Sequence, residues 1–175
     1  MADQIRITLP DGTESLRPTG TVVGELLEAD PKGGPSGLIV AAKVNGASVD
    51  LKHRLTGDAA VVPIHAASPE GLSILRHSMS HVMAQAVQET FKDVQVSIGP
   101  AIEDGFYYDF DYAETFTPED LDKIEARMRE IVAADIPFER REVSRSEAVD
   151  LFRGKNESYK VELINDLPAE VDKVS

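Results

Sequence analysis

Residues 71–91 read GLSILRHSMSHVMAQAVQETF, a stretch in which apolar residues recur every three or four positions. At about 100° per residue, this spacing gathers them within one sector of about 120° around a helix. The stretch therefore predicts a long amphipathic helix whose apolar stripe packs against the rest of its domain. The residues of this stripe are Leu72, Leu75, Met79, Met83, Ala86 and Val87.

Two histidines, His77 and His81, lie four residues apart on the opposite side of this helix, beside Ala84, Gln85 and Gln88. Their spacing suits two ligands of a metal ion, although a zinc site needs a third and usually a fourth ligand. Imidazoles with pKa values near ~6.5 also suit proton transfer to and from water, or the binding of a substrate. An ordinary exposed polar face explains the pair as well, so the spacing alone leaves three interpretations open.

The segment after this helix is rich in aromatic residues. Residues 98–110 read IGPAIEDGFYYDF, and strand alternation there places Tyr108 on one face with Phe106 and Phe110. We expect the two phenylalanines to pack into the core. Because a buried tyrosine needs a partner for its hydroxyl, we consider Tyr108 a candidate ligand-binding residue.

The rest of the chain predicts an α+β protein of two domains. Strand, turn and short helix signals over residues 1–66 follow the order ββαβββ, which is typical of a small α+β roll. A polar, proline-containing joint follows, and we place a linker at residues 67–72 and a second domain at residues 73–175. Residues 117–134 predict a helix capped by Thr117, and the last residues, from about 167 to 175, are expected to fray.

Composition excludes several classes of protein. The 175 residues include no cysteine, which excludes a disulfide framework, a thiolate zinc site and a cysteine nucleophile within them. No apolar stretch approaches the ~20 residues of a membrane-spanning helix, and the first residues do not resemble a secretory signal. We therefore expect a cytoplasmic protein that does not contact a membrane.

The charge is negative and unevenly distributed. The 18 basic and 31 acidic residues give a net charge of −13. Residues 1–66 contribute 6 − 8 = −2 and residues 67–175 contribute 12 − 23 = −11. Such a surface repels phosphate at long range, which argues against a general nucleic-acid-binding protein.

Five segments occur in an order that identifies a family. They are RHSMSH at 76–81, SIGPAIEDGFYYDF at 97–110, TPEDLDKIEARM at 117–128, FERREVSRSEAVDLF at 138–152 and NESYKVELI at 156–164. Together they closely resemble the amino-terminal half of bacterial threonyl-tRNA synthetases (threonine–tRNA ligases). The resemblance implies a β-grasp TGS domain over residues 1–66. An α+β editing domain would follow, with its long histidine-bearing helix packed on an antiparallel sheet.

The resemblance also assigns roles to four residues. Editing domains of this family hydrolyse mischarged seryl-tRNA(Thr), because a binding pocket separates serine from threonine by only ~1–3 kcal/mol for one methyl group. His77 and His81 match the family's catalytic histidine pair. Tyr108 and Lys160 match residues that bind the substrate, the aminoacylated 3′ end of tRNA(Thr). Without the resemblance, Lys160 would be interpreted as an exposed helical lysine, and we expect no metal or cofactor at this site.

Other parts of the family's enzymes are not represented before Ser175. They are a Cys-x-x-x-His motif that completes the editing pocket, the aminoacylation core with its zinc and ATP/Mg sites, and the anticodon-binding domain. The parent enzyme is expected to dimerise through that core, and residues 1–175 alone are expected to edit weakly or not at all. Two alternatives remain open: a freestanding TGS-type interaction or regulatory module, and a metal-binding protein that uses the histidine pair.

Overall fold

The computed structural model describes residues 3–28, 38–136, 138 and 141–175. It confirms the α+β class, with one mixed sheet and five helices in the described residues. Contacts divide the chain into two compact units, Met1–Leu75 and Arg76–Ser175, and the division falls within the long helix α2 (Pro69–Thr90). No helix of the described residues combines the length and the apolar character that crossing a membrane requires.

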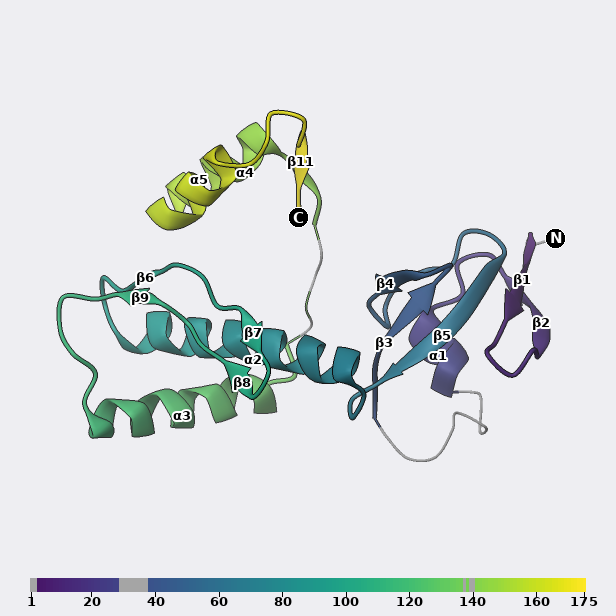
Figure 1. The fold of residues 1–175 in the computed structure, drawn as a ribbon, viewed down its shortest axis with the longest axis horizontal. Coiled ribbons are helices and arrows are strands. Elements are labelled where there is room, and N and C mark those ends of the chain that lie inside the picture. The colour runs from purple at the N-terminus through teal and green to yellow at the C-terminus, as the bar shows by residue number, and fades with distance from the viewer. Residues whose placement is uncertain (1–2, 29–37, 137, 139–140) are drawn as a thin grey trace. The chain divides into compact units, whose positions relative to one another are not determined.

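A five-stranded mixed sheet organises the first unit (Figure 1). Its strand order is β2-β1-β5-β3-β4, in which β1 and β5 run parallel and the other neighbours run antiparallel. The predicted order ββαβββ is confirmed, whereas the predicted turn at residues 30–35 lies outside the described residues. The elements are β1 (Gln4–Thr8), β2 (Glu14–Pro18), α1 (Val23–Glu28), β3 (Ile39–Val44), β4 (Ala47–Val49) and β5 (Ala59–His65).

One apolar core holds this sheet and helix α1 together. Strand β1 alternates exposed and buried residues, so that Ile5 and Ile7 face the core. The turn between β3 and β4 places Asn45 and Gly46 at φ values of 51° and 86°. Asparagine and glycine tolerate this left-handed backbone best, which explains why the chain reverses at this dipeptide.

Helix α2 begins two residues before the predicted start near Gly71, so residues 69–72 of the expected linker are helical. The reason is local. The Ser68 hydroxyl accepts a hydrogen bond from the Gly71 amide at 3.0 Å, and Pro69 occupies the first helical position. The Ser-Pro pair that resembled a linker is therefore a helix start.

The first turn of α2 is also tied to the sheet of the first unit. The Glu70 carboxylate accepts hydrogen bonds from the Lys43 ammonium at 2.7 Å and the Ser48 hydroxyl at 3.0 Å. These two bonds, the one from Lys43 above all, lower the pKa of Glu70. They fix the start of the helix against β3 and β4.

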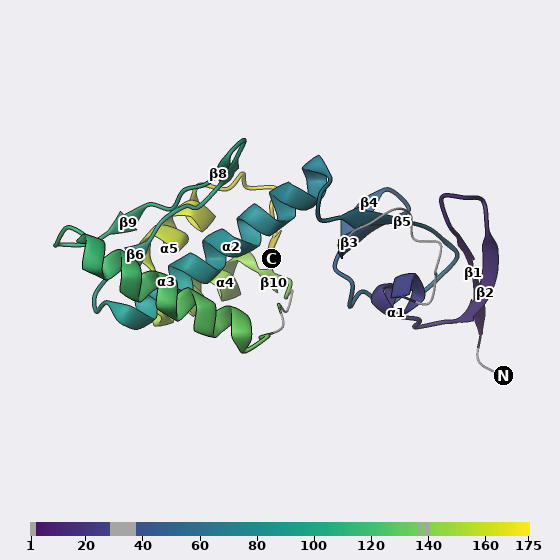
Figure 2. The same cartoon turned by 90° about the horizontal axis from the view of Figure 1, so that it is seen from below.

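In the second unit, α2 packs against helix α3 (Pro118–Ala133), and the two views agree that these helices lie side by side (Figures 1 and 2). Ala86 and Val87 of α2 share a core with Ile124 and Ile131 of α3. The predicted cap of α3 is confirmed: Thr117 and Asp120 exchange hydrogen bonds in a capping box. The remaining members of this core are Val82, Val94, Met83, Phe91, Phe110, Tyr112, Phe116 and Met128.

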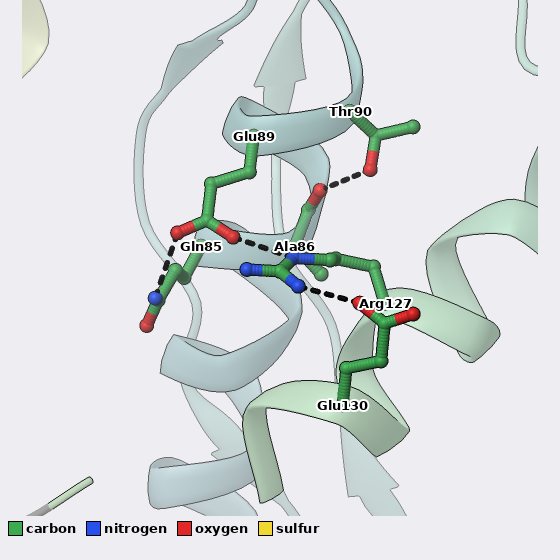
Figure 3. A network of polar contacts seen from close by, with 6 residues as sticks. All are labelled: Gln85, Ala86, Glu89, Thr90, Arg127 and Glu130. Carbon is green, nitrogen blue, oxygen red and sulfur yellow. Dashed lines mark hydrogen bonds and ion pairs between the residues drawn. The ribbon is translucent and has the colours of Figure 1, made fainter. Parts of the chain in front are cut away.

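A polar network supports the same helix pair at the surface (Figure 3). The Arg127 guanidinium of α3 donates to Glu89 of α2 at 2.7 Å and to Glu130 at 2.5 Å. Gln85 donates to the second oxygen of Glu89 at 2.9 Å. These hydrogen bonds raise the pKa of Arg127 and lower that of Glu89. Because all of these groups are well exposed, we expect packing of the apolar core to contribute more stability.

The expected antiparallel sheet of the second unit is a ribbon of short ladders. Strand β6 (Gln95–Val96) pairs with β9 (Phe110–Asp111), and β7 (Ala101–Ile102) pairs with β8 (Gly105–Phe106). The regular pairing is interrupted around residues 99–100, where Pro100 has no amide hydrogen to donate. Up to this point the pairing of β6 with β9 is extended by two hydrogen bonds, from the Ser97 amide to the Asp109 carbonyl oxygen and from the Asp109 amide to the Ile98 carbonyl oxygen.

The end of the chain is paired, which contradicts the expectation that residues 167–175 fray. Strand β11 (Lys173–Val174) pairs with β10 (Val143–Ser144), beside helices α4 (Arg145–Gly154) and α5 (Ser158–Asn165). The Arg145 guanidinium also donates to the carbonyl oxygens of Asn165 at 2.6 Å and Pro168 at 3.3 Å. A two-residue strand has no periodicity to detect in a sequence, which is why it was missed.

The core between α2 and α3 predicts that substitutions of two neighbouring residues, Ile131 and Val132, change the stability by very different amounts. Ile131 is 6% exposed and Val132 is 56% exposed. Ile131→Ala should lower the free energy of unfolding by about 2–4 kcal/mol through lost burial and a residual cavity, and Val132→Ala by less than about 0.5 kcal/mol. Urea unfolding followed by tyrosine fluorescence measures this, because all 4 tyrosines lie in the second unit. Equal effects of the two substitutions would contradict the packing described.

Candidate functional site

The histidine pair lies on the exposed side of α2, as predicted. The Nε2 atoms of His77 and His81 are 3.1 Å apart, and the rings meet edge to face with centroids 4.6 Å apart. Partial desolvation lowers the pKa of His81, and the nearby His77 and the Lys160 ammonium lower it further. A lowered pKa means that the His81 imidazole is neutral at pH 7, with one ring nitrogen able to accept a proton.

The buried surface of α2 is wider than the predicted stripe. Ala84, expected beside the histidines, is only 6% exposed, whereas Leu72, expected in the stripe, is 39% exposed. The reason is that the β6–β9 ribbon covers a second side of the helix. Ser80 shows this contact: it is fully buried, and its hydroxyl lies 2.9 Å from the Gly99 carbonyl oxygen and 2.8 Å from that of His77.

Tyr108 lies on this ribbon, and its ring packs directly on Gly99. A Cβ atom at position 99 would lie 2.1 Å from Cδ2 of the Tyr108 ring, so only glycine fits. The ring also stacks on Phe110, with centroids 5.2 Å apart. The predicted alternation is confirmed, because Phe106, Tyr108 and Phe110 are partly buried while Tyr107 is exposed. Desolvation raises the pKa of Tyr108, and the charge of Glu157 raises it further.

Lys160 reaches the same ribbon from helix α5. Its ammonium donates to the Ser97 carbonyl oxygen at 2.6 Å and lies 5.9 Å from the centroid of the Tyr108 ring. Desolvation lowers the pKa of Lys160, and the charge of Glu157 opposes this effect. The interpretation of Lys160 as an exposed helical lysine is therefore wrong, because its charged end is held against the backbone of the ribbon.

Further contacts dock α5 on the strands. The Ser158 hydroxyl donates to the Gln95 side chain at 2.5 Å, and the Tyr159 hydroxyl donates to the Asp111 carboxylate at 2.8 Å. Sequence reasoning did not identify Ser97, Gly99 or Glu157 as part of the site. Gly99 was visible as a turn residue, but its contact with Tyr108 depends on the tertiary fold. Ser97 contributes a backbone carbonyl, for which no sequence signal exists.

The structure thus brings all four predicted residues into one neighbourhood of the second unit. It places the imidazoles of His77 and His81, the Lys160 ammonium and the Tyr108 ring around the junction of α2, the ribbon and α5. In the parts of the chain that are described, no three His, Cys, Asp or Glu side chains form a group that could hold a metal ion. The absence of a metal at this site stays a prediction, as do the catalytic and binding roles of the four residues.

Comparison with known proteins gives a consistent set of relatives, although no family model matches the chain. A threonine–tRNA ligase of Pelobacter propionicus is 52% identical over 166 residues, which are 95% of this chain and 26% of the relative. One of Geobacter sp. strain M21 is 50% identical over 99% of this chain and 27% of the relative. One of Maricaulis maris is 48% identical over 94% of this chain. The chain spans about a quarter of the length of the curated relatives it matches.

The contact between Gly99 and Tyr108 predicts the effect of one added methyl group. Gly99→Ala should displace the Tyr108 ring and lower the free energy of unfolding by about 1–3 kcal/mol through overpacking. Two-dimensional NMR should show the change in the contacts between the Tyr108 ring and the Lys160 side chain, and urea unfolding should show the lost stability. The matched control is Gly154→Ala, since a Cβ atom at position 154 meets nothing within 4 Å. Identical spectra for wild type and Gly99→Ala would contradict the packing.

The charge of Lys160 predicts a change in the titration of His81. Lys160→Gln removes a positive charge that lowers the pKa of His81, so the variant's His81 should titrate at a higher pH than in wild type. The imidazole Hε1 resonances, followed by NMR from pH 4 to pH 9, measure this shift. Lys155→Gln removes an exposed charge near α5 and is the control. A His81 titration that is the same in all three proteins would show that Lys160 does not act on the histidine pair.

Proposed function

Because the chain belongs by sequence to the threonyl-tRNA synthetase family, we propose that it forms the amino-terminal region of an enzyme that joins threonine to tRNA(Thr) using ATP. Within this proposal, residues 1–66 are a TGS domain of β-grasp fold. The mixed sheet with a central parallel pair, β1 and β5, and one helix on its core supports that fold. Residues 73–175 are part of an editing domain. We assign the ATP/Mg and zinc sites and the dimer contacts to other parts of such an enzyme, and place it in the cytoplasm.

The editing site in this proposal is the neighbourhood of His77, His81, Tyr108 and Lys160, and its substrate is seryl-tRNA(Thr). The observation that carries the proposal is geometric: the Nε2 atoms of the histidine pair lie 3.1 Å apart, and the Lys160 ammonium is held 2.6 Å from the Ser97 carbonyl oxygen and 5.9 Å from the centroid of the Tyr108 ring. The lowered pKa values of His81 and Lys160 support it. Hydrolysis of an ester needs a base to take a proton from water and a donor to stabilise the developing oxyanion. An imidazole and an ammonium are well suited to these two tasks.

The reaction proceeds as an addition followed by an elimination. The water oxygen bonds to the ester carbonyl carbon while its proton passes to a ring nitrogen of the histidine pair. The bond from that carbon to the ribose oxygen then breaks, and the ribose oxygen takes a proton as serine leaves. Lys160 and Tyr108 hold the seryl group and the terminal adenosine. The 3.1 Å contact of the two imidazoles lets one ring orient the other.

Binding of a non-hydrolysable substrate analogue to residues 1–175 tests the proposed site. We expect 3′-(L-seryl)amino-3′-deoxyadenosine to bind, and His77→Ala or Lys160→Gln to weaken binding by about tenfold or more, since each removes a hydrogen bond to a charged or polar group. Isothermal titration calorimetry gives the dissociation constants. His53→Ala and Lys155→Gln, which alter exposed residues outside the site, are the controls. Absence of binding to wild type, or equal loss in the controls, would contradict the proposal.

Deacylation gives a second measurement of the same proposal. The chain would replace the corresponding part of a full-length threonine–tRNA ligase, and hydrolysis of seryl-tRNA(Thr) would be followed over time. His81→Ala should slow this hydrolysis by at least about 100-fold, as expected for loss of an acid–base group, and leave threonine aminoacylation unchanged. Unchanged hydrolysis in the His77→Ala and His81→Ala variants would contradict the assigned roles.

A further inference from the structure

Glu157 lies at the start of α5 in a position that helix capping does not explain. It is the N-cap residue, yet its side chain makes no capping hydrogen bond. Glutamate is a poor choice for this position compared with serine, threonine, aspartate or asparagine. Its side chain instead extends toward α2, where Oε1 accepts a hydrogen bond from Gln88.

The second carboxylate oxygen of Glu157 is unusual. Oε2 is buried and accepts no hydrogen bond from any residue that the structure describes. Leaving a buried polar atom without a partner costs free energy, and more so when the group is charged. A neutral glutamine could also accept the hydrogen bond from Gln88. The hydrogen bond from Gln88 therefore does not explain why a charged side chain occupies position 157. The residues around Glu157 offer an explanation.

Of the titratable side chains of the site, Lys160 and Tyr108 lie within reach of this carboxylate's charge, and the two histidines lie on α2, whose Gln88 holds it. Lys160 is three residues further along α5 and, at about 100° per residue, lies within about 60° of Glu157 around the helix. Tyr108 faces it from the ribbon, and His81, with His77 beside it, belongs to the side of α2 that carries Gln88. Lys160 makes no ion pair with Glu157 within 4.0 Å among the described residues, because its ammonium is directed to Ser97. Glu157 therefore acts on Lys160 through space.

The direction of this action follows from the charges. Desolvation favours the neutral amine of Lys160, and the negative charge of Glu157 favours the ammonium. The same charge disfavours the phenolate of Tyr108. Glu157 thus offsets part of the desolvation of the Lys160 ammonium, and it adds to the preference of Tyr108 for its neutral hydroxyl.

We propose that Glu157 is a positioning residue that serves as the counter-charge of this site. Held by the hydrogen bond from Gln88, it places a negative charge on the same side of α5 as Lys160 without forming a direct ion pair that would occupy the ammonium. The absence of a direct ion pair leaves the ammonium free to turn from Ser97 to the ester oxygen of a seryl substrate. This step rests on the proposed function. Glu157 itself contacts no reacting atom.

The titration of Lys160 tests this proposal without any ligand. In protein labelled with 15N-lysine, the Nζ resonance of Lys160, assigned by its loss in Lys160→Gln, is followed by NMR as the pH rises. Glu157→Gln should make Lys160 titrate at a lower pH than in wild type, and Glu157→Asp, which keeps the charge, should restore most of the difference. The control is Glu162→Gln, an exposed glutamate of α5 about 160° away from Lys160 around the helix.

The result that would overturn the proposal is a Lys160 titration in Glu157→Gln that equals wild type, or a shift no larger than that of Glu162→Gln. If Glu157→Gln does not fold, Gln88→Ala replaces it. Without Gln88 the Glu157 carboxylate should move into solvent, and Lys160 should again titrate at a lower pH than in wild type. An unchanged titration in Gln88→Ala would then overturn the proposal. Failure of the seryl-adenosine analogue to bind would refute the proposed function alone, since this titration needs no substrate.

Discussion

The hydrogen bond from the Lys160 ammonium to the Ser97 carbonyl oxygen, 2.6 Å long, is the interaction on which the site depends. It joins α5 to the β6–β9 ribbon across 63 positions of sequence. A lysine tied down in this way loses hydration and side-chain freedom, and the fold compensates with neighbouring contacts. The bond from Tyr159 to Asp111 fixes the next residue of the helix on the same strands.

Helix α2 contributes the histidine pair to the site. Two faces of this helix are covered by other parts of the second unit. Helix α3 covers one through Ile124 and Ile131, and the ribbon covers another through the contact of Ser80 with Gly99. What stays exposed is a narrow strip that carries His77 and His81. An isolated helix face would leave both imidazoles fully hydrated. The partly enclosed strip brings His81 close enough to Lys160 for the ammonium to disfavour protonation of the imidazole.

Much of the fold was predictable because local patterns determined it. The order ββαβββ, the helix at residues 71–91, the capping box at Thr117 and the alternation around Tyr108 all follow from periodicity and turn chemistry. The start of α2 was missed because Ser68 and Pro69 suit a linker and a helix start equally well. Strand β11 was missed because two residues form no pattern. The burial of Ala84 depends on the ribbon, whose position relative to the helix no periodicity specifies.

The residues of the proposed site could be named from the sequence, but their physical surroundings could not. The histidine pair and Tyr108 could be proposed from spacing, whereas Lys160 was identified by resemblance and would otherwise have been interpreted as a surface residue. Its desolvated surroundings, and the Glu157 oxygen for which no described residue supplies a partner, arise only when α5 docks on the ribbon and on α2. The net charge of −13 gives no indication of this local arrangement of the Lys160 ammonium, the Glu157 carboxylate and the histidine pair.

A crystal structure of the chain with 3′-(L-seryl)amino-3′-deoxyadenosine tests the central claim most directly, namely that these elements form one site for an aminoacylated adenosine. The account predicts the seryl group within hydrogen-bonding distance of the Lys160 ammonium and of the His77 and His81 pair, with the adenosine beside Tyr108. An analogue bound elsewhere on the chain, with these four side chains free of contact to it, would contradict the account.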